Sequence, residues 1–245
     1  MSGAVTLATA RRVLQQLRRD PRTVALLIVV PALLMTLFRW VLNDQRVAFN
    51  RIGAPVFGVF PMIVMFVVAS VATLRERRTG TLERLLTMPM HKLDLLLGYG
   101  IAFGAAAIAQ VGVCLLLTIG PLGLRVSGSG WLLFLIGVCS ALLGMALGLL
   151  LSAFAGSEFQ AVQFMPAVMF PQLLLCGLVT PRDKMDSVLH GVSDALPMTY
   201  AVDALQRVTR TARVDGQLVV DLVVLALVAV AALALGAATL RRRTA

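Results

Sequence analysis

The sequence predicts an all-α polytopic membrane protein with six transmembrane helices. Two observations lead to this fold class. Of the 245 residues, 59% are hydrophobic and only 14% are charged, whereas roughly a quarter of the residues in a soluble domain are charged. The apolar residues also collect in runs of about 20, the length of a helix that crosses the hydrocarbon core of a bilayer. We therefore expect residues 1–245 to form a single transmembrane domain.

The first element expected is a helix that lies in the membrane interface over residues 1–20. Ala10, Val13 and Leu17 fall on one face of this helix and its arginines fall on the other. This division is typical of helices that lie along a membrane surface. Pro21 then ends the pattern and lets the chain turn into the membrane.

Six apolar runs qualify as membrane spans. They cover residues 23–42, 53–74, 95–120, 130–155, 159–180 and 222–240. None of them carries an ionisable side chain near its centre, where the proton relays of ion-driven carriers are found. The sequence therefore gives no support to transport driven by an ion gradient.

The basic residues predict the orientation of these spans. Arginines cluster before the first span, between the second and third, and after the sixth. Because cytoplasmic loops carry an excess of Lys and Arg, we expect both termini to be cytoplasmic in a multi-pass protein of the cell (inner, plasma) membrane, surrounded by membrane lipids. The net charge of +10 has the same explanation, and we expect no nucleic-acid partner.

Two segments between the spans have helical patterns of their own. Residues 75–92 form a charged segment in which a short amphipathic helix follows Gly80 and stops at Pro89. A plain interfacial helix and a coupling helix that docks on a cytoplasmic partner both fit this pattern. Residues 181–216 contain two apolar stripes with helical spacing, which predict two short external helices that re-enter the outer leaflet.

The chain lacks the sequence patterns of an enzyme. No HExxH, GxSxG or Walker A pattern is present, so we expect no catalytic residues and no ATP site of this kind. The three cysteines lie inside apolar runs without CxxC spacing, and we read them as small buried side chains rather than metal ligands. We therefore expect this chain to bind no metal and no cofactor.

Three segments, taken in order, resemble one family. Residues 76–86 resemble its ER-x-x-GTLE-x-L segment, residues 177–181 its G-x-x-x-P segment and residues 196–205 its LP-x-TY-x-x-x-x-L segment. The chain resembles the permease (transmembrane) subunits of type-2 ABC transporters, with most similarity to drug-efflux permeases of the daunorubicin-resistance kind.

This resemblance implies partners and a coupling segment. It implies two copies of a separate cytoplasmic ABC ATPase subunit, which bind ATP and Mg²⁺, and a second permease that is either another copy of this chain or a sister permease. It implies that the ATPases act on the segment between the second and third spans. The residues that it assigns to ATPase coupling are Glu76, Arg77, Gly80, Thr81, Leu82, Glu83, Leu85 and Leu86.

The resemblance also implies a substrate path between the second and fifth spans of the two permeases. Uncharged amides beside aromatic rings suit an amphiphilic substrate. The residues that provide them are Phe57, Phe60, Phe66, Gln160, Gln163, Phe164 and Phe170.

The function expected is therefore the membrane-spanning half of an ATP-driven exporter that moves an amphiphilic substrate (drug, lipid or glycan-like) outward. The alternative is a membrane scaffold or assembly factor that transports nothing and recruits a cytoplasmic protein through residues 75–92. The sequence leaves the substrate open, as it does the choice between a homodimer and a heterodimer.

Overall fold

The structure, a computed structural model, describes residues 3–80, 92–211 and 214–239. Every regular element in these ranges is helical, which confirms the all-α fold class. The elements are α1 (Gly3–Arg19), α2 (Pro21–Val41), α3 (Arg46–Arg78), α5 (Lys92–Ile119), α6 (Gly130–Leu151), α7 (Glu158–Leu175), the 3-10 turn η1 (Arg182–Lys184), α8 (Ser187–Ala195), α9 (Pro197–Arg210) and α10 (Gly216–Thr239).

Within the described ranges, five helices are long and apolar enough to cross a membrane: α2, α3, α5, α6 and α10. The remaining expected span, 159–180, corresponds to α7, which is different in character. It has 18 residues, among them three glutamines and two prolines, and its length of about 27 Å falls short of a hydrocarbon core of about 30 Å. Length and composition thus support five spans, and α7 is the helix on which a count of six depends.

Helix α3 is longer than the expected span 53–74. It begins at Arg46 and continues through 33 residues to Arg78, about 50 Å of helix. The sequence contains no glycine or proline between Pro61 and Gly80, and charged side chains by themselves do not stop a helix. The start of the expected connecting segment 75–92 is therefore the last turn of α3. In contrast, α6 and α7 end before the expected residues 155 and 180.

Helices α3 and α6 form the centre of the bundle. In each of them 67% of the most apolar stretch is buried, compared with 17% in α2 and 22% in α10. Two glycines of α6 make this close approach possible, because a Cβ on Gly144 would overlap the Met62 carbonyl and a Cβ on Gly148 would overlap the Phe66 carbonyl. Small residues four apart commonly bring membrane helices together in this way.

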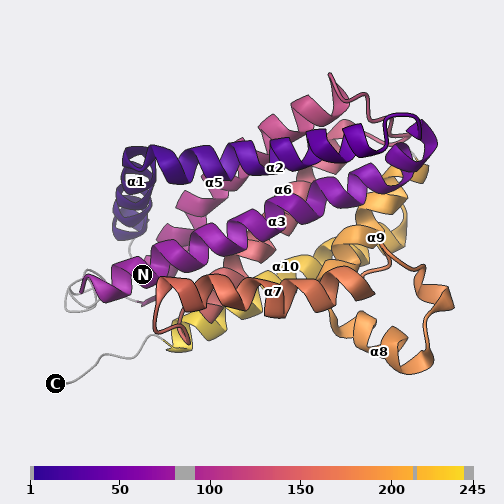
Figure 1. The fold of residues 1–245 in the computed structure, drawn as a ribbon. Coiled ribbons are helices and arrows are strands. Elements are labelled where there is room, and N and C mark those ends of the chain that lie inside the picture. The colour runs from indigo at the N-terminus through magenta and orange to yellow at the C-terminus, as the bar shows by residue number, and fades with distance from the viewer. Residues whose placement is uncertain (1–2, 81–91, 212–213, 240–245) are drawn as a thin grey trace.

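The two ends of the bundle carry different elements (Figure 1). Helix α1 lies across one end, against α5, and the last turn of α3, the first turn of α7 and the end of α10 lie at the same end. We call this the α1 end. The opposite end, which we call the α9 end, carries the link between α2 and α3 together with η1, α8 and α9.

The outer faces of the peripheral helices are apolar. Exposed side chains include Leu33 on α2, Ile108 on α5 and Leu227 on α10, which are 52%, 53% and 63% exposed. So many exposed large hydrophobic side chains are anomalous on a surface in water and normal on one that faces lipid. Together with the length of the five helices, this surface identifies a multi-pass membrane protein.

Candidate functional site at the α1 end

The predicted coupling segment begins where α3 ends. The Thr79 N–H donates to the Arg75 carbonyl and the Gly80 N–H to the Arg77 carbonyl, which closes the last turn. Gly80 has a φ of 70°, a conformation that glycine adopts without the steric cost paid by other residues. The glycine of the ER-x-x-GTLE segment is therefore the residue that stops this helix.

Glu76 is the centre of a network that joins three helices. Its carboxylate lies 3.2 Å from the Arg12 guanidinium of α1 and accepts a hydrogen bond from the Tyr99 hydroxyl of α5. The Glu76 side chain is only 12% exposed and that of Arg12 28%, so water screens this pair less than a surface pair. Because α3 presents this carboxylate to two other helices, a displacement of its last turn strains both contacts.

Arg75 connects the same turn to two further helices. Its guanidinium donates to both Glu158 oxygens, at 3.2 and 3.3 Å, and lies 3.6 Å from Asp20. Glu158 is the first residue of α7 and Asp20 caps α2. The Arg75 side chain is 54% exposed, so these contacts orient the helix ends more than they stabilise the fold.

Asp20 is held as a carboxylate by its role at the start of α2. Hydrogen bonds from the Thr23 hydroxyl (2.7 Å) and the Thr23 backbone N–H (3.2 Å), followed by the charge of Arg75, lower the pKa of Asp20 below its ordinary value. Pro21 follows at the first helical position, where its missing N–H costs nothing.

A cleft of about 570 Å³ lies beside this network, between α1, α2, α3 and α5. Its apolar wall includes Leu17, Val67 and Phe103, and its polar wall includes Arg75 and Glu76. The described part of the chain contains no group of three or more His, Cys, Asp or Glu side chains placed to hold a metal ion. What the α1 end supplies is a set of polar contacts that link the last turn of α3 to α1, α2, α5 and α7.

The structure places only part of the predicted coupling set. Glu76 and Arg77 lie in the last turn of α3, and Gly80 ends it. The Nε atom of Arg77 is buried and has no hydrogen-bond partner among the described residues. The rest of the set lies outside the described residues: Thr81, Leu82, Glu83, Leu85 and Leu86.

The predicted substrate-path residues divide into two groups. Phe57 and Phe66 are fully buried within the chain's own core, and Phe57 packs against Gly137 of α6. They therefore present no surface to a substrate in this structure. Phe60 and Phe164 are partly buried.

The remaining three residues of the path are exposed on α7. They are Gln160, Gln163 and Phe170. The structure thus leaves a polar and aromatic face on α7, while the two most buried rings of α3 point into the protein. Of the three α3 residues predicted for the path, only Phe60 keeps exposed surface.

The other two motifs have structural roles near the α9 end. Gly177 has a φ of 86°, so it provides the left-handed residue that follows α7. Pro197 is the first residue of α9, and Gln172 of α7 accepts a hydrogen bond from the Met198 N–H. The Tyr200 hydroxyl donates to the Asp194 carbonyl. These residues fix α7, α8 and α9 to one another.

Sequence reasoning missed the partners in the network. In the sequence, Arg12 indicates only the orientation of the first span, and Asp20 indicates only a helix boundary. Tyr99 lies in an apolar run and belongs to no recognisable motif. Glu158 stands out as an acid between two spans, yet nothing local pairs it with Arg75, 83 residues away. Only the packing of the helices brings these partners together.

Comparison with known proteins identifies the family. The ABC-2 type transporter family matches residues 4–209. The chain is 30% identical over 206 residues to the Escherichia coli (strain K12) protein named "Probable multidrug ABC transporter permease YbhS", a match that covers 84% of this chain and 54% of that protein. It is 28% identical over 174 residues to "Inner membrane transport permease YhhJ" of the same organism, covering 67% of this chain and 46% of that protein.

A more distant similarity reaches "ABC transporter G family member 20" of Dictyostelium discoideum, at 29% identity over 139 residues, 57% of this chain and 19% of that protein. The chain spans about half the length of the bacterial relatives or less. The family match nevertheless covers the α1-end network, both motif segments near the α9 end and all the described helices except α10. The chain therefore belongs to the ABC-2 type transporter family.

Proposed function

We propose that this chain is the membrane-spanning permease subunit of an ATP-driven exporter, which moves an amphiphilic substrate outward and takes its energy from a separate ATPase subunit. The family membership and the names of the bacterial relatives, both of which are called permeases, support this role. In this proposal ATP and Mg²⁺ bind to the ATPase and not to this chain.

The observation that carries the proposal is the position of Glu76. The motif of residues 76–86 begins in the last turn of α3, and that turn is bonded to α1 and α5 through Glu76 and to α2 and α7 through Arg75. An ATPase that moves the residues after Gly80 pulls on a helix about 50 Å long, and these bonds pass the movement to four others.

We also propose the finer features of the transporter. The α1 end faces the cytoplasm, with both termini, and α7 serves as a sixth span of the inner membrane. Two permeases, identical or sister chains, pair above two ATPases. The exposed residues Gln160, Gln163 and Phe170 of α7 line the path between them, because lone amides on a lipid-facing helix are costly and amides facing a polar path are not.

Reconstitution of the permease with its partner ATPase tests docking and transmission separately. Glu83→Arg and Leu86→Asp are expected to abolish complex formation. Glu76→Gln is expected to leave the complex intact and to lower ATP-driven transport of a fluorescent amphiphilic drug or a fluorescent phospholipid about tenfold. Arg125→Glu, a charge reversal on an exposed side chain of the link between α5 and α6, is the matched control and is expected to change neither.

Two results would contradict the proposal. If Glu83→Arg and Leu86→Asp leave both complex formation and transport unchanged, the segment does not couple the ATPase to the permease. If the wild-type complex hydrolyses ATP and moves neither probe nor any other solute, the chain is a scaffold that recruits the ATPase.

A further inference from the structure

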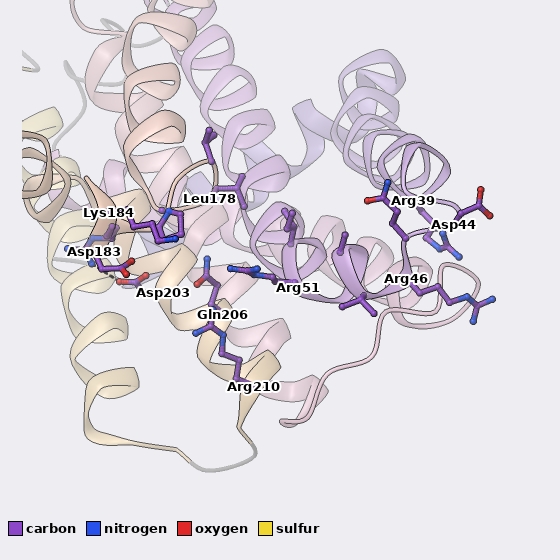
Figure 2. Close-up of a pocket in the computed structure, with 18 of the residues that line it drawn as sticks. Arg39, Asp44, Arg46, Arg51, Leu178, Asp183, Lys184, Asp203, Gln206 and Arg210 are labelled. Atoms are coloured by element: carbon purple, nitrogen blue, oxygen red, sulfur yellow. Dashed lines mark hydrogen bonds and ion pairs between the residues drawn. The ribbon is translucent and has the colours of Figure 1, made fainter. Parts of the chain in front are cut away.

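The α9 end holds a second and larger cleft, of about 1520 Å³ (Figure 2). Three parts of the chain that are far apart in the sequence form it: the link between α2 and α3, the segment that follows α7, and the outward side of α9. Figure 2 shows Arg51 reaching from α3 toward Gln206 and Asp203 of α9, with Lys184 on the far side and Arg46 near the end of α2.

The side chains that line the cleft carry a net positive charge. Among the described residues that line it, six are basic and three are acidic. Four of the basic side chains are exposed and form no ion pair with any acid of the described chain. They are Arg46, Arg51, Lys184 and Arg210. Unpaired cations around one concave volume raise the local concentration of anions.

The other two cations of the cleft are held by the protein itself. Arg39 donates to three backbone carbonyls, those of Leu122, Leu42 and Asn43. Arg182 pairs with Asp194 and with Asp203, the latter at 2.8 Å. These two arginines are therefore part of the walls, and the four unpaired cations remain exposed.

The start of α3 adds to the positive potential. Residues 45–48 line the cleft, and Gln45 caps the helix without a side-chain hydrogen bond, with no acidic residue in the first turn. The first N–H groups of a helix have no acceptor within the helix and carry its positive dipole end. Combined with the unpaired arginines, they provide hydrogen-bond donors suited to phosphate oxygens.

Two exposed valines are among the residues that line the cleft, and we call them the rim valines. Val47 is 84% exposed and Val179 is 65% exposed, and both line the same volume as the cations. An exposed valine beside these cations would contribute nothing to the binding of a free anion. It would contact the hydrocarbon of a molecule that carries both an anionic group and an apolar chain.

We propose that the α9-end cleft is a binding site for the phosphate group of an amphiphile, such as an anionic membrane lipid, with the rim valines in contact with its first carbons. Arg51 binds the phosphate from the α3 wall, and Arg46 and the first turn of α3 add to the positive potential around it. Lys184 and Arg210 compensate its charge from the opposite wall. This equilibrium binding does not depend on the transport activity proposed above.

Isothermal titration of the full-length protein in a non-ionic detergent tests the proposal. The probes are inorganic phosphate, sn-glycerol 3-phosphate, and dihexanoyl phosphatidylglycerol below its micelle concentration. Arg46→Gln/Arg51→Gln is expected to lower the affinity for the phosphate-bearing probes at least tenfold, and Arg51→Lys to retain part of it. Arg125→Gln, at an exposed arginine of the same end that does not line the cleft, is expected to change the affinity less than twofold.

The probes also distinguish the two sources of phosphate. Wild type is expected to bind the lipid more tightly than glycerol phosphate, and Val47→Ser to lower only the affinity for the lipid. Equal affinity for the two would overturn the role of the rim valines. Absence of binding by every probe would overturn the site, as would equal losses in Arg46→Gln/Arg51→Gln and Arg125→Gln. All three arginines have exposed side chains. A melting temperature equal to that of wild type shows that a variant is folded.

Discussion

Two pairs of arginines, one at each end of the bundle, differ in their partners. At the α1 end, Arg12 and Arg75 pair with carboxylates from other helices. At the α9 end, Arg46 and Arg51 face a cleft and pair with no acid among the described residues. Arg182 and Arg207 pair with acids at the α9 end as well. The contrast is therefore between the two pairs of arginines: Arg12 and Arg75 connect helices, whereas the charges of Arg46 and Arg51 stay available.

Charge at the end of a membrane helix therefore has no single structural role. Both sets of arginines lie at the ends of α3 or beside them, where a helix of about 50 Å extends beyond the hydrocarbon core. What separates them is whether a neighbouring helix brings an acid within reach.

The largest loss of stability is expected at the contact between α3 and α6, which holds the centre of the bundle together. Gly144→Ala places a Cβ against the Met62 carbonyl of α3, and backbone cannot move aside as a side chain can. We expect a loss of about 3 kcal/mol in the free energy of unfolding. Gly100→Ala is the matched control, because nothing lies within 4 Å of the added Cβ, and we expect it to be neutral or slightly stabilising. Unfolding in mixed detergent micelles measures both, and equal losses would contradict this account.

Removal of one acid at each end tests the comparison directly. Glu76→Ala leaves Arg12 without its carboxylate and Tyr99 without its acceptor, so we expect a destabilisation of about 2 kcal/mol. Asp44→Ala removes an exposed acid of the α9 end and is expected to cost less than about 0.5 kcal/mol. The same unfolding measurement compares them. If the two variants lose similar amounts of unfolding free energy, the α1-end network contributes little to stability.

Tyr99→Phe removes a single hydroxyl from the α1-end network. We expect a loss of about 1 kcal/mol, the usual net contribution of one hydrogen bond. Because Tyr99 acts through Glu76, Tyr99→Phe is expected to add little in a Glu76→Ala background. A double-mutant cycle measures this, and strictly additive effects would mean that the two side chains do not interact.

A smaller effect is expected from the exposed pairs. Arg75→Gln breaks the contacts with Asp20 and Glu158, which are more than a third exposed, and we expect a loss of about 0.5 kcal/mol that falls as salt rises. Arg51→Gln at the α9 end breaks no ion pair and is expected to be neutral. The free energy of unfolding of each variant, measured at low and at high salt, distinguishes them. If salt changes the stability loss in the same direction in both variants, the contrast between the two arginines is wrong.

The smallest effect concerns pH. Because the pKa of Asp20 is lowered in the folded protein, its ionised form favours folding. This contribution is complete above the unfolded value of about 3.9 and is lost as the pH falls through the folded pKa. The stability difference between wild type and Asp20→Asn is therefore expected to be constant above about pH 5 and to shrink below it. A difference that grows on acidification would contradict the shift.

The α9 end provides a parallel for this pH effect. The pKa of Asp215 is lowered by a hydrogen bond from the Leu218 N–H and by Arg207. Asp215→Asn is expected to show the same pH profile as Asp20→Asn, because an acid beside a helix start is stabilised at either end. Opposite pH profiles would show that the pKa of each carboxyl group depends on the surroundings of its end of the bundle rather than on its position beside a helix start.

Much of the fold was predictable because it depends on local properties. The long apolar runs indicate membrane helices, and Gly80 and Gly177 mark helix ends where the structure has positive φ. The extent of α3 was not predictable from hydropathy, because a helix continues through charged residues until glycine or proline stops it. The candidate site was predictable only in part: Glu76 stands in a recognisable motif, and its partners Arg12 and Tyr99 do not.

Two glycine pairs show the limit of sequence patterns. Gly100 and Gly104 have the same spacing as Gly144 and Gly148, and either pair predicts a close helix contact. In the structure a Cβ on Gly144 or Gly148 would overlap backbone of α3, whereas Gly100 has nothing within 4 Å and Gly104 only an ordinary contact at 3.7 Å. Glycines four residues apart therefore permit a close helix contact, but the contact forms only where another helix packs against that face.

The sequence alone determined that this is a helical membrane protein with a family motif after its second long apolar run, because periodicity, hydropathy and short motifs are properties of neighbouring residues. The tertiary structure decided which arginines are paired and which are not, that Phe57 and Phe66 point inward, and that distant segments enclose a basic cleft. These depend on the faces that separate helices present to one another, and no stretch of sequence contains both faces.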